Sequence, residues 1–208
     1  MYMPPKFTES DRGVALAAIK NPGWGYLVGV ADGVPTAAHL PFLLQGAPGA
    51  EKLVAHMARA NPHWQSFADG VEQLVVFAGP HTYVSPRWYA AEPAVPTWNY
   101  VAVHVYGVPR VVDDAQEVYA AQKRLVDFHE SGTDRPWRLE DMPEDFVAGM
   151  LGAIVNFEIP IARIEAKFKL SQNRTADDRK GVIAALGQGE REDSRRIAAL
   201  MAAREPAD

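Results

Sequence analysis

The segment VPTWNYVAVHVYG, residues 95–107, alternates in a way that is typical of a β-strand and decides the fold of the surrounding sequence. Successive side chains of a strand point to opposite faces. One face is mostly aliphatic and consists of Thr97, Asn99, Val101, Val103 and Val105. The other is mostly aromatic and consists of Trp98, Tyr100, Ala102, His104 and Tyr106. We expect the valine face to enter a core and the aromatic face to meet helices, a partner subunit or a ligand.

Short apolar runs bounded by Gly, Pro and other turn residues precede this strand, and they predict further strands. Residues 24–44 suggest two strands around Asp32-Gly33, a strong hairpin signal. The other predicted strands are the opening segment, EKLVAHMARA at 51–60, EQLVVFAG at 72–79 and TYVSPRWYA at 82–90. So many strands in a short stretch favour a closed or nearly closed barrel, because closure removes sheet edges.

Helical periodicity dominates the second half of the chain. Apolar residues recur at helical spacing over 115–128, and a second helix is expected to open at 141–144 and to carry Phe146, Met150 and Ile154. Residues 157–171 alternate like one strand, with Pro160 at a bulge or edge. Thr175 starts a further helix that Gly187 ends, and a last helix surrounds Ile197. Near the N-terminus, Thr8 and Asp11 predict a helix that Asn21-Pro22 stops.

Composition excludes several classes of protein. The chain has 208 residues, of which 48% are hydrophobic, and it contains no run of roughly 18 apolar residues that would span a membrane. The absence of cysteine excludes disulfides and thiolate metal sites, and no signal peptide is legible, so we expect a cytoplasmic protein. A net charge of −5 argues against a protein that coats nucleic acid. The GxGxxG, GxxxxGK[ST], GxSxG and HExxH motifs are absent.

Individual polar residues give weak signals, but polar clusters that interrupt the strands give a stronger one. His56 and His63 have no carboxylate at ligand spacing, so no metal site is predicted. For Glu158 and Glu165 a solvated face is favoured over a pair of site carboxylates. The clusters are HLPF, HMARANPHW, SPRWY, VPTWNY and KLSQNR. They suit either a flat heteroaromatic ligand with an anionic tail, or core aromatics whose polar atoms are satisfied at a barrel mouth.

With MYMPPKF at the start, these motifs resemble the PaiB family, which is described as FMN-binding negative transcriptional regulators. The resemblance extends from Met1 to about Leu186, and VPTWNY and KLSQNR are its most specific parts. It implies a mainly β fold with α-helices, namely an FMN-binding split β-barrel with flanking helices over 1–188 and a charged helical tail over 189–208. It also implies a homodimer with FMN at the subunit interface.

The resemblance further implies which residues bind the cofactor: Arg59, Asn61, Trp64, Lys169, Ser171, Gln172 and Asn173. No catalytic residue is assigned, because the flavin itself would perform any redox step. Three functions are compatible with this resemblance. They are an FMN-binding negative transcriptional regulator, a flavin-dependent oxidoreductase of the split-barrel type, and a dimeric protein with a vestigial or haem-like pocket. Direct binding to DNA is expected to be weak, and no membrane association is expected.

Arg59 has a separate physical basis for its assignment. The strand period places it on the same face as Leu53, Ala55 and Met57, where a charge needs an anionic partner or access to the barrel mouth. That partner could be a carboxylate of the protein or the phosphate of FMN. The Asn61-Pro62 step that follows favours a turn able to present backbone amides.

Overall fold

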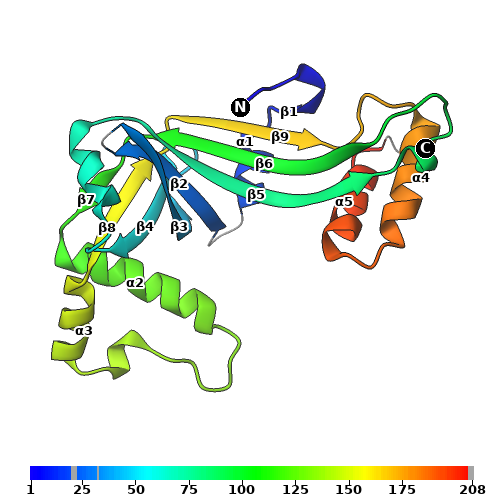
Figure 1. The fold of residues 1–208 in the computed structure, drawn as a ribbon. Coiled ribbons are helices and arrows are strands. Elements are labelled where there is room, and N and C mark those ends of the chain that lie inside the picture. Colours follow the sequence, from blue (N-terminus) through cyan, green and yellow to red (C-terminus); the bar gives the residue numbers. More distant parts are fainter. Residues whose placement is uncertain (20–22, 32, 206–208) are drawn as a thin grey trace. The chain divides into compact units, whose positions relative to one another are not determined.

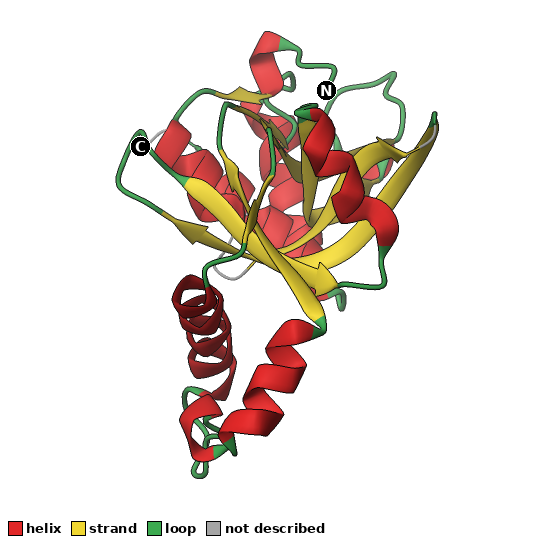
Figure 2. Ribbon diagram, turned by 90° about the vertical axis from the view of Figure 1, so that its left-hand side faces the viewer, coloured by secondary structure: helices red, strands yellow, loops and turns green. Residues whose placement is uncertain are grey.

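A computed structural model of the chain describes residues 1–19, 23–31 and 33–205. The described chain forms two compact units. Unit 1 contains Met1–Ala18, Ala78–His104 and the described residues from Glu165 onward, and unit 2 contains those of Ile19–Phe77 and Val105–Ile164. Each unit mixes strands with helices (Figures 1 and 2). Three long strands, β5, β6 and β9, belong partly to each unit.

Unit 2 is built on a sheet whose strand order is β5-β2-β3-β4-β8-β7. Its strands are β2 (Gly23–Ala31), β3 (Val34–Gln45), β4 (Lys52–Ala58), the first part of β5 (Gln73–Val84), β7 (Arg110–Val112) and β8 (Ile154–Pro160). The strand pairs β2–β3, β2–β5, β3–β4, β4–β8 and β7–β8 are antiparallel. A 3-10 helix, η2 (Pro62–Asp69), connects β4 to β5.

The β2–β3 hairpin confirms one of the strongest sequence signals. Ala31 pairs with Val34 at the end of the hairpin. Asp32 lies outside the described residues, whereas Gly33 has a φ of 75°, the left-handed conformation that such turns require. Further along, β3 leaves β2 after Phe42 and pairs with β4 from Leu43 onward. A strand that changes partner in this way turns a corner in the sheet, as strands of a barrel do.

Aromatic side chains fill the core of unit 2. Phe42 packs edge-on against Phe77 and Phe157, with ring centroids 5.7 and 6.4 Å apart, and Phe67 of η2 lies 5.0 Å from Phe157. The fully buried aliphatic side chains of unit 2 include Leu27, Leu53, Val75 and Ile159. Burial of such side chains contributes about 1.5–3 kcal/mol each, so this core is the main source of stability for the unit.

Two helices belong to unit 2 and project from its strands (Figure 2). They are α2 (Ala115–Glu130) and α3 (Glu144–Gly152), with a 3-10 turn, η4 (Leu139–Asp141), between them. Asp114 caps α2 by accepting hydrogen bonds from the amides of Gln116 and Glu117. Ala121 of α2 packs against Leu43 and Val54, so this helix covers the outer side of β3 and β4.

Unit 1 contains strands in the order β1-β9-β6-β5. They are β1 (Thr8–Glu9), most of β9 (Arg163–Lys169), most of β6 (Thr97–Gly107) and the second part of β5. Its helices are α1 (Arg12–Ile19, through Ala18), α4 (Ala176–Gly187) and α5 (Glu192–Ala202), with 3-10 turns η1 (Pro5–Phe7) and η3 (Pro86–Trp88). Thr175 caps α4 by accepting a hydrogen bond from the amide of Asp178, and α4 and α5 lie side by side in Figure 1.

The two faces of β6 behave as their alternation predicts. Asn99, Val101 and Val103 are buried, whereas Trp98 and Tyr100 on the opposite face keep part of their surface exposed. Phe168, Leu170, Val182, Ile197 and Met201 complete the buried interior of unit 1. The helix predicted around Ile197 is present as α5, and Ile197, Ala198 and Met201 are its buried apolar residues.

Some predicted elements are wrong in their boundaries. Residues 72–79 and 82–90 are not two strands, because β5 runs without interruption to Val84. The single strand predicted over 157–171 is two strands, β8 and β9, separated after Pro160. Ile154 starts β8 and does not belong to α3.

The N-terminal segment also differs from the prediction. Thr8 lies in β1, and the start of α1 is capped by Asp11, which accepts a hydrogen bond from the amide of Val14. The predicted stop at Asn21-Pro22 and the last residues of the predicted tail, 206–208, lie outside the described residues.

In the part of the chain that the structure describes, no helix is long and apolar enough to cross a lipid bilayer.

Candidate functional site

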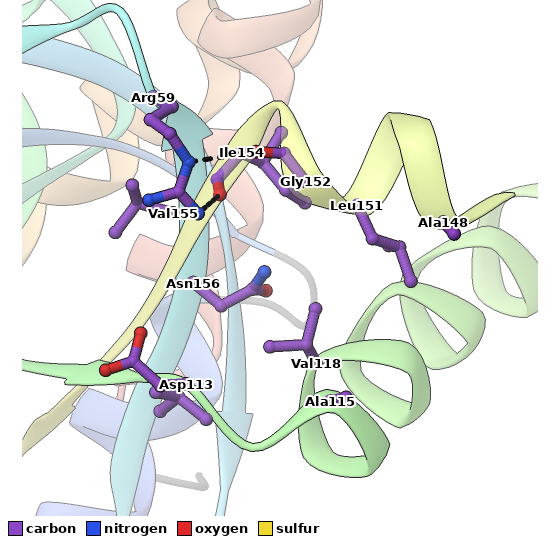
Figure 3. A pocket seen from close by; sticks show the side chains of 11 residues that line it. Arg59, Asp113, Ala115, Val118, Ala148, Leu151, Gly152, Ile154, Val155 and Asn156 are labelled. Carbon is purple, nitrogen blue, oxygen red and sulfur yellow. Dashed lines mark hydrogen bonds between the residues drawn. The ribbon is translucent and has the colours of Figure 1, made fainter. Parts of the chain in front are cut away.

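A cavity of about 330 Å³ opens in unit 2 beside the end of β4 (Figure 3). Strand β8, the segment from β7 into α2, and helix α3 enclose it. Its lining residues are Arg59, Val112, Asp113, Ala115, Val118, Ala148, Leu151, Gly152, Ile154, Val155 and Asn156. Most of these side chains are apolar, and only Arg59, Asp113 and Asn156 bring polar groups. An apolar cavity with a few polar groups is the usual form of a small-molecule site.

Asn156 contributes a buried donor that no group of the described chain satisfies. Its Oδ1 accepts a hydrogen bond of 2.8 Å from Nε2 of Gln122, which also lies 3.1 Å from Nδ1 of His56. Burial lowers the pKa of His56, so its imidazole is neutral and Nδ1 can accept from Gln122. This chain of bonds fixes the amide of Asn156, whose Nδ2 has no partner among the described residues.

Arg59 lies just beyond β4 and bonds to the backbone at the α3–β8 connection. Its Nε donates to the carbonyl oxygen of Gly152 and its Nη2 to that of Ile154, both at 2.8 Å (Figure 3). A guanidinium has five N–H donors, so two bonds leave three available. The sequence predicts a carboxylate of the protein or the phosphate of FMN as the partner of this guanidinium, whereas the partners that the structure shows are carbonyl oxygens.

Asn61 and Trp64 organise the turn that follows Arg59. The Asn61 side chain accepts a hydrogen bond of 3.0 Å from the amide of His63 and thereby caps η2. Nε1 of Trp64 donates a 3.0 Å hydrogen bond to the carbonyl oxygen of Arg59. The segment from Arg59 to Trp64 is therefore held by its own side chains, and Arg59 alone among these three lines the cavity.

The other four predicted site residues lie in unit 1, at the end of β9 and in the turn before α4. Nζ of Lys169 donates to Oγ1 of Thr97 and to the carbonyl oxygen of Trp98. Burial, together with the charges of Lys167 and Arg174, lowers the pKa of Lys169. A partly buried lysine whose ammonium feels two further positive charges has the electrostatics of an anion contact.

The three residues after Leu170 have different environments. Ser171 is buried, and Nδ2 of Asn99 donates to its hydroxyl. Gln172 bonds to the backbone at both ends of its amide, accepting from the amide of Leu170 and donating to the carbonyl oxygen of Phe168. Asn173 is exposed. Ser171 and Gln172 thus stabilise the turn itself, and their assignment to the cofactor stays a prediction.

The sequence interpretation missed Asn156 and misplaced Glu158, both on β8. Glu158 was expected on a solvated face, but its carboxylate is buried and forms ion pairs with Lys52 and Arg110. Burial acts to raise the pKa of Glu158, but the hydrogen bonds and charges of Lys52 and Arg110 outweigh it and leave the pKa below its ordinary value. The sequence signal that could have found both residues is a polar residue inside the otherwise apolar run IVNFEIP.

The described residues contain no group of three or more histidine, aspartate or glutamate side chains that could hold a metal ion.

Comparisons with known sequences identify the family of the chain. A family described as "Putative FMN-binding domain" matches residues 1–163. The chain is 32% identical over 201 residues to "Protease synthase and sporulation protein PAI 2" of Bacillus subtilis, an alignment that covers 97% of this chain and 96% of that protein. It is also 30% identical to an uncharacterised protein of Emericella nidulans, over 86% of this chain and 82% of the fungal protein.

Solved structures show where the fold recurs. The flavocytochrome Anf3 from Azotobacter vinelandii has a TM-score of 0.59 at 16% identity, covering 82% of this chain and 70% of that protein. An FAD and heme binding protein from Mycobacterium smegmatis has a TM-score of 0.54 at 20% identity, covering 86% and 79% of the two chains. At such identities the likeness shows the fold alone. The predicted mainly β fold of the flavin-binding split-barrel type is thus confirmed.

Proposed function

Since the chain belongs to the PaiB family of FMN-binding-domain proteins, we propose that it is a cytoplasmic negative regulator of transcription whose activity depends on bound FMN. The observation that carries this proposal is the alignment with PAI 2, which extends over nearly the whole of both chains. The name of that relative refers to protease synthesis and sporulation, and both are processes that a regulator would control. FMN is the cofactor that the family match assigns to this domain.

The cavity beside Arg59 has the chemistry to receive the flavin ring. Val118, Leu151 and Val155 offer apolar walls for a flat ring system, and the free Nδ2 of Asn156 is a donor for one of the ring's carbonyl or nitrogen acceptors. About 330 Å³ lies at the lower end of ligand pockets, which suits the ring better than the whole of FMN. When bound, FMN supplies a redox-active ring, while the protein binds and orients it.

The rest of the cofactor would then lie outside the cavity, and Arg59 is placed to meet it. The three N–H groups that Arg59 does not use for the backbone are suited to a phosphate. We extend the proposal to a homodimer, in which a second copy covers the part of FMN that the cavity leaves exposed. Lys169 of unit 1 is the remaining cationic candidate for the phosphate, because it is partly buried and lies near further positive charge.

Regulation through another molecule is favoured over direct DNA binding. The helix pair α4–α5 has the spacing of a helix-turn-helix, but the first turn of α5 carries Glu192 and Asp193, where a recognition helix contacts DNA. Nη1 of Arg195 donates hydrogen bonds to the carbonyl oxygens of Gly189 and Glu190 in the α4–α5 connection. The net charge of −5 adds repulsion from phosphates.

The proposal is tested with the purified chain and with a Bacillus subtilis strain that lacks PAI 2. We expect FMN to bind with a characteristic flavin absorption spectrum, and we expect the gene for this chain to restore protease and sporulation levels. A variant that folds but does not bind FMN should not restore them. Equal restoration by that variant would contradict a flavin-dependent regulator.

The same preparation separates the other two functions. Steady turnover of NADH or NADPH by the FMN-loaded protein with an acceptor, together with no effect on transcripts, would make it an oxidoreductase. A haem absorption band in place of the flavin spectrum would favour a haem-like pocket. Tight, sequence-specific binding to duplex DNA at physiological salt would show that the regulator acts directly on an operator.

A further inference from the structure

A groove between helices α2 and α3 of unit 2 continues from the cavity beside Arg59. Its volume is about 390 Å³, and both helices project from the strands of the unit in Figure 2. Its lining residues are Ala115, Tyr119, Leu139, Glu140, Met142, Glu144, Val147, Ala148 and Leu151. Three of them, Ala115, Ala148 and Leu151, also line the cavity, so the groove and the cavity adjoin one another (Figure 3).

The chain path sets the direction of this groove. Helix α2 leads away from β7, and α3 leads back into β8. Because β7 and β8 are paired, the start of α2 and the end of α3 lie at the sheet. Ala115 and Leu151 therefore mark the end of the groove next to the sheet, and Glu144, which begins α3, marks the opposite end.

Apolar side chains form the walls of the groove. Leu139 and Val147 are each 8% exposed, whereas Tyr119, Met142 and Leu151 are only half-buried. A volume of about 390 Å³ lies within the roughly 300–1,000 Å³ that is usual for small-molecule sites. An apolar body that packs against these half-buried walls would remove further apolar surface from water, which favours binding.

Carboxylates mark the end of the groove that lies away from the sheet. Glu140 accepts a hydrogen bond from Nζ of Lys123, but Lys123 also pairs with Asp127, so one cation serves two carboxylates. Glu144 is exposed and forms no ion pair within the described residues. Among those residues, no basic side chain lines the groove.

The negative charge of the chain is concentrated on this part of the sequence. Residues 113–152, which contain both helices, have ten acidic and four basic side chains, whereas the rest of the chain has 16 acidic and 17 basic ones. A surface with an excess of one sign of charge attracts ligands of the opposite sign. The groove therefore favours a cation over an anion.

Charge and shape together select one class of ligand. An anionic amphiphile would be repelled by Glu140 and Glu144, and a purely hydrophilic cation would leave the apolar walls in contact with water. Leu151 lies two helical turns beyond Glu144, about 10 Å along α3, which is the length of a small amphiphile. We propose that the groove binds a hydrophobic amine. Its apolar body lies against Tyr119, Met142 and Val147, and its ammonium group meets Glu144.

This binding does not depend on FMN, and the experiment uses the full chain without the flavin. Phenylbutylammonium is titrated into protein with ¹³C-labelled methyl groups, and phenylbutanol and phenylbutyrate are the probes of matched size. We expect the methyl signal of Met142 to shift saturably. The signal of Met150, which is 56% exposed on α3 and does not line the groove, should stay in place. The amine should bind about tenfold more tightly than the alcohol, the combined scale of two exposed ion pairs, and the carboxylate more weakly than the alcohol.

Two adjacent acids in the first turn of α3 provide a matched pair of variants. Glu144→Gln removes a carboxylate that lines the groove, whereas Asp145→Asn removes its neighbour, which does not line it. We expect Glu144→Gln to lower the ratio of amine affinity to alcohol affinity about threefold, the scale of one exposed ion pair. Asp145→Asn should leave this ratio nearly unchanged. A variant that only disturbed the helix would weaken both ligands and leave their ratio as it was.

Aromatic residues of α2 test the apolar wall. Tyr119→Ala should weaken the amine and the alcohol by the same factor, about fivefold, because both have the same apolar body. Phe128→Ala is the control, since Phe128 is 51% exposed on the same helix and does not line the groove. It should change neither affinity.

Any of four results would overturn the site. They are no saturable shift of Met142, equal affinities for the amine and the alcohol, equal changes of their ratio in Glu144→Gln and Asp145→Asn, and a shift of Met142 on dilution of the protein alone. The last result would show that a second copy of the chain fills the groove. Failure of FMN to bind, with the amine still bound as expected, would contradict the proposed function and leave this groove standing.

Discussion

Nδ2 of Asn99 donates a hydrogen bond of 2.9 Å to the hydroxyl oxygen of Ser171 inside unit 1. Both side chains are buried, and the same Nδ2 lies 3.5 Å from Sδ of Met201 on α5. Ser171 has a φ of 64°, a left-handed conformation that disfavours residues other than glycine. The hydrogen bond therefore joins β6 to a strained turn, and it offsets part of the cost of that turn.

Ser171→Ala should lower the free energy of unfolding by about 1–3 kcal/mol, because it removes the hydrogen bonds between the Ser171 hydroxyl and the Asn99 amide and leaves the buried Nδ2 of Asn99 with only the sulfur of Met201. Ser171→Gly loses the same bond but relieves the left-handed backbone, so it should cost about 1 kcal/mol less than alanine. Urea unfolding followed by circular dichroism measures both. Asn173→Ala, two residues further on and exposed, is the control and should change the stability by less than about 0.5 kcal/mol. If Ser171→Ala and Asn173→Ala lowered the free energy of unfolding equally, the bond between Asn99 and Ser171 would not stabilise the fold.

The buried carboxylate of Glu158 should make stability depend on pH. Although burial opposes ionisation, Lys52 and Arg110 hold the pKa of Glu158 below its ordinary value. A pKa that is lower in the folded chain gives stability that is complete above the unfolded value, about 4.3 for Glu, and is lost as pH falls through the folded value. Glu158→Gln should cost about 1–3 kcal/mol at pH 7 and progressively less below about pH 5.

Urea midpoints of the wild type and Glu158→Gln between pH 7 and pH 3 test this expectation. Glu140→Gln is the matched control, because Glu140 pairs with Lys123 at an exposed position. A difference between wild type and Glu158→Gln that stays constant across the whole range would show that the charge of Glu158 does not stabilise the fold.

The parts of this fold that the sequence predicts are those governed by local rules. The alternation in β6, the Asp32-Gly33 hairpin and the Thr175 cap each depend on residues close together in the chain. The sequence predicts two strands where the structure has the single strand β5, because Gly79-Pro80 has the composition of a turn. In the structure, a Cβ at Gly79 would lie 2.9 Å from Cβ of Val101, so glycine serves the close approach of two strands. That need is not visible from the local sequence.

The errors on β8 have a tertiary cause. Val155, Asn156, Phe157, Glu158 and Ile159 are all buried, so neither face of β8 meets solvent. One face meets the aromatic core through Phe157, and the other meets α2, as the bond from Gln122 to Asn156 shows. Alternation predicts a polar face to be solvated, and it fails where a helix from a different part of the chain covers that face. The candidate cavity is formed by this same helix, which explains why Asn156 was missed.

A homodimer remains a prediction, and the aromatic face of β6 gives it a test. Trp98 is 49% exposed and Tyr83 of β5 44%, and their rings lie 6.1 Å apart in unit 1. Aromatic residues are enriched at protein interfaces, so we expect this pair to be buried by a second copy. Trp98→Glu should shift the sedimentation coefficient from dimer to monomer at micromolar concentration. Val95→Glu, at an exposed apolar position outside the strands, is the control. A wild-type chain that sediments as a monomer would contradict the dimer.

Arg59 is the residue on which the placement of FMN depends most. It already donates to the carbonyl oxygens of Gly152 and Ile154, so its removal affects the protein as well as the ligand. For this reason a loss of FMN binding alone would not identify a phosphate contact. Riboflavin, which has the ring and the ribityl chain but no phosphate, separates the two effects, because only the phosphate contact distinguishes the ligands.

Arg59→Ala should weaken FMN by about 1.5–3 kcal/mol, the scale of a charge-assisted hydrogen bond, and should leave riboflavin nearly unchanged. Quenching of flavin fluorescence measures both affinities, and far-UV circular dichroism verifies the fold. Arg59→Lys keeps the positive charge but loses the planar guanidinium, which can donate two parallel hydrogen bonds to a phosphate. It should therefore recover only part of the difference in affinity between FMN and riboflavin. Trp64→Phe is the control, since it keeps an aromatic ring and the guanidinium but removes the indole N–H that donates to the carbonyl oxygen of Arg59. If the wild type binds FMN and riboflavin equally, or if Arg59→Ala weakens both to the same degree, Arg59 holds the α3–β8 connection and does not bind the phosphate.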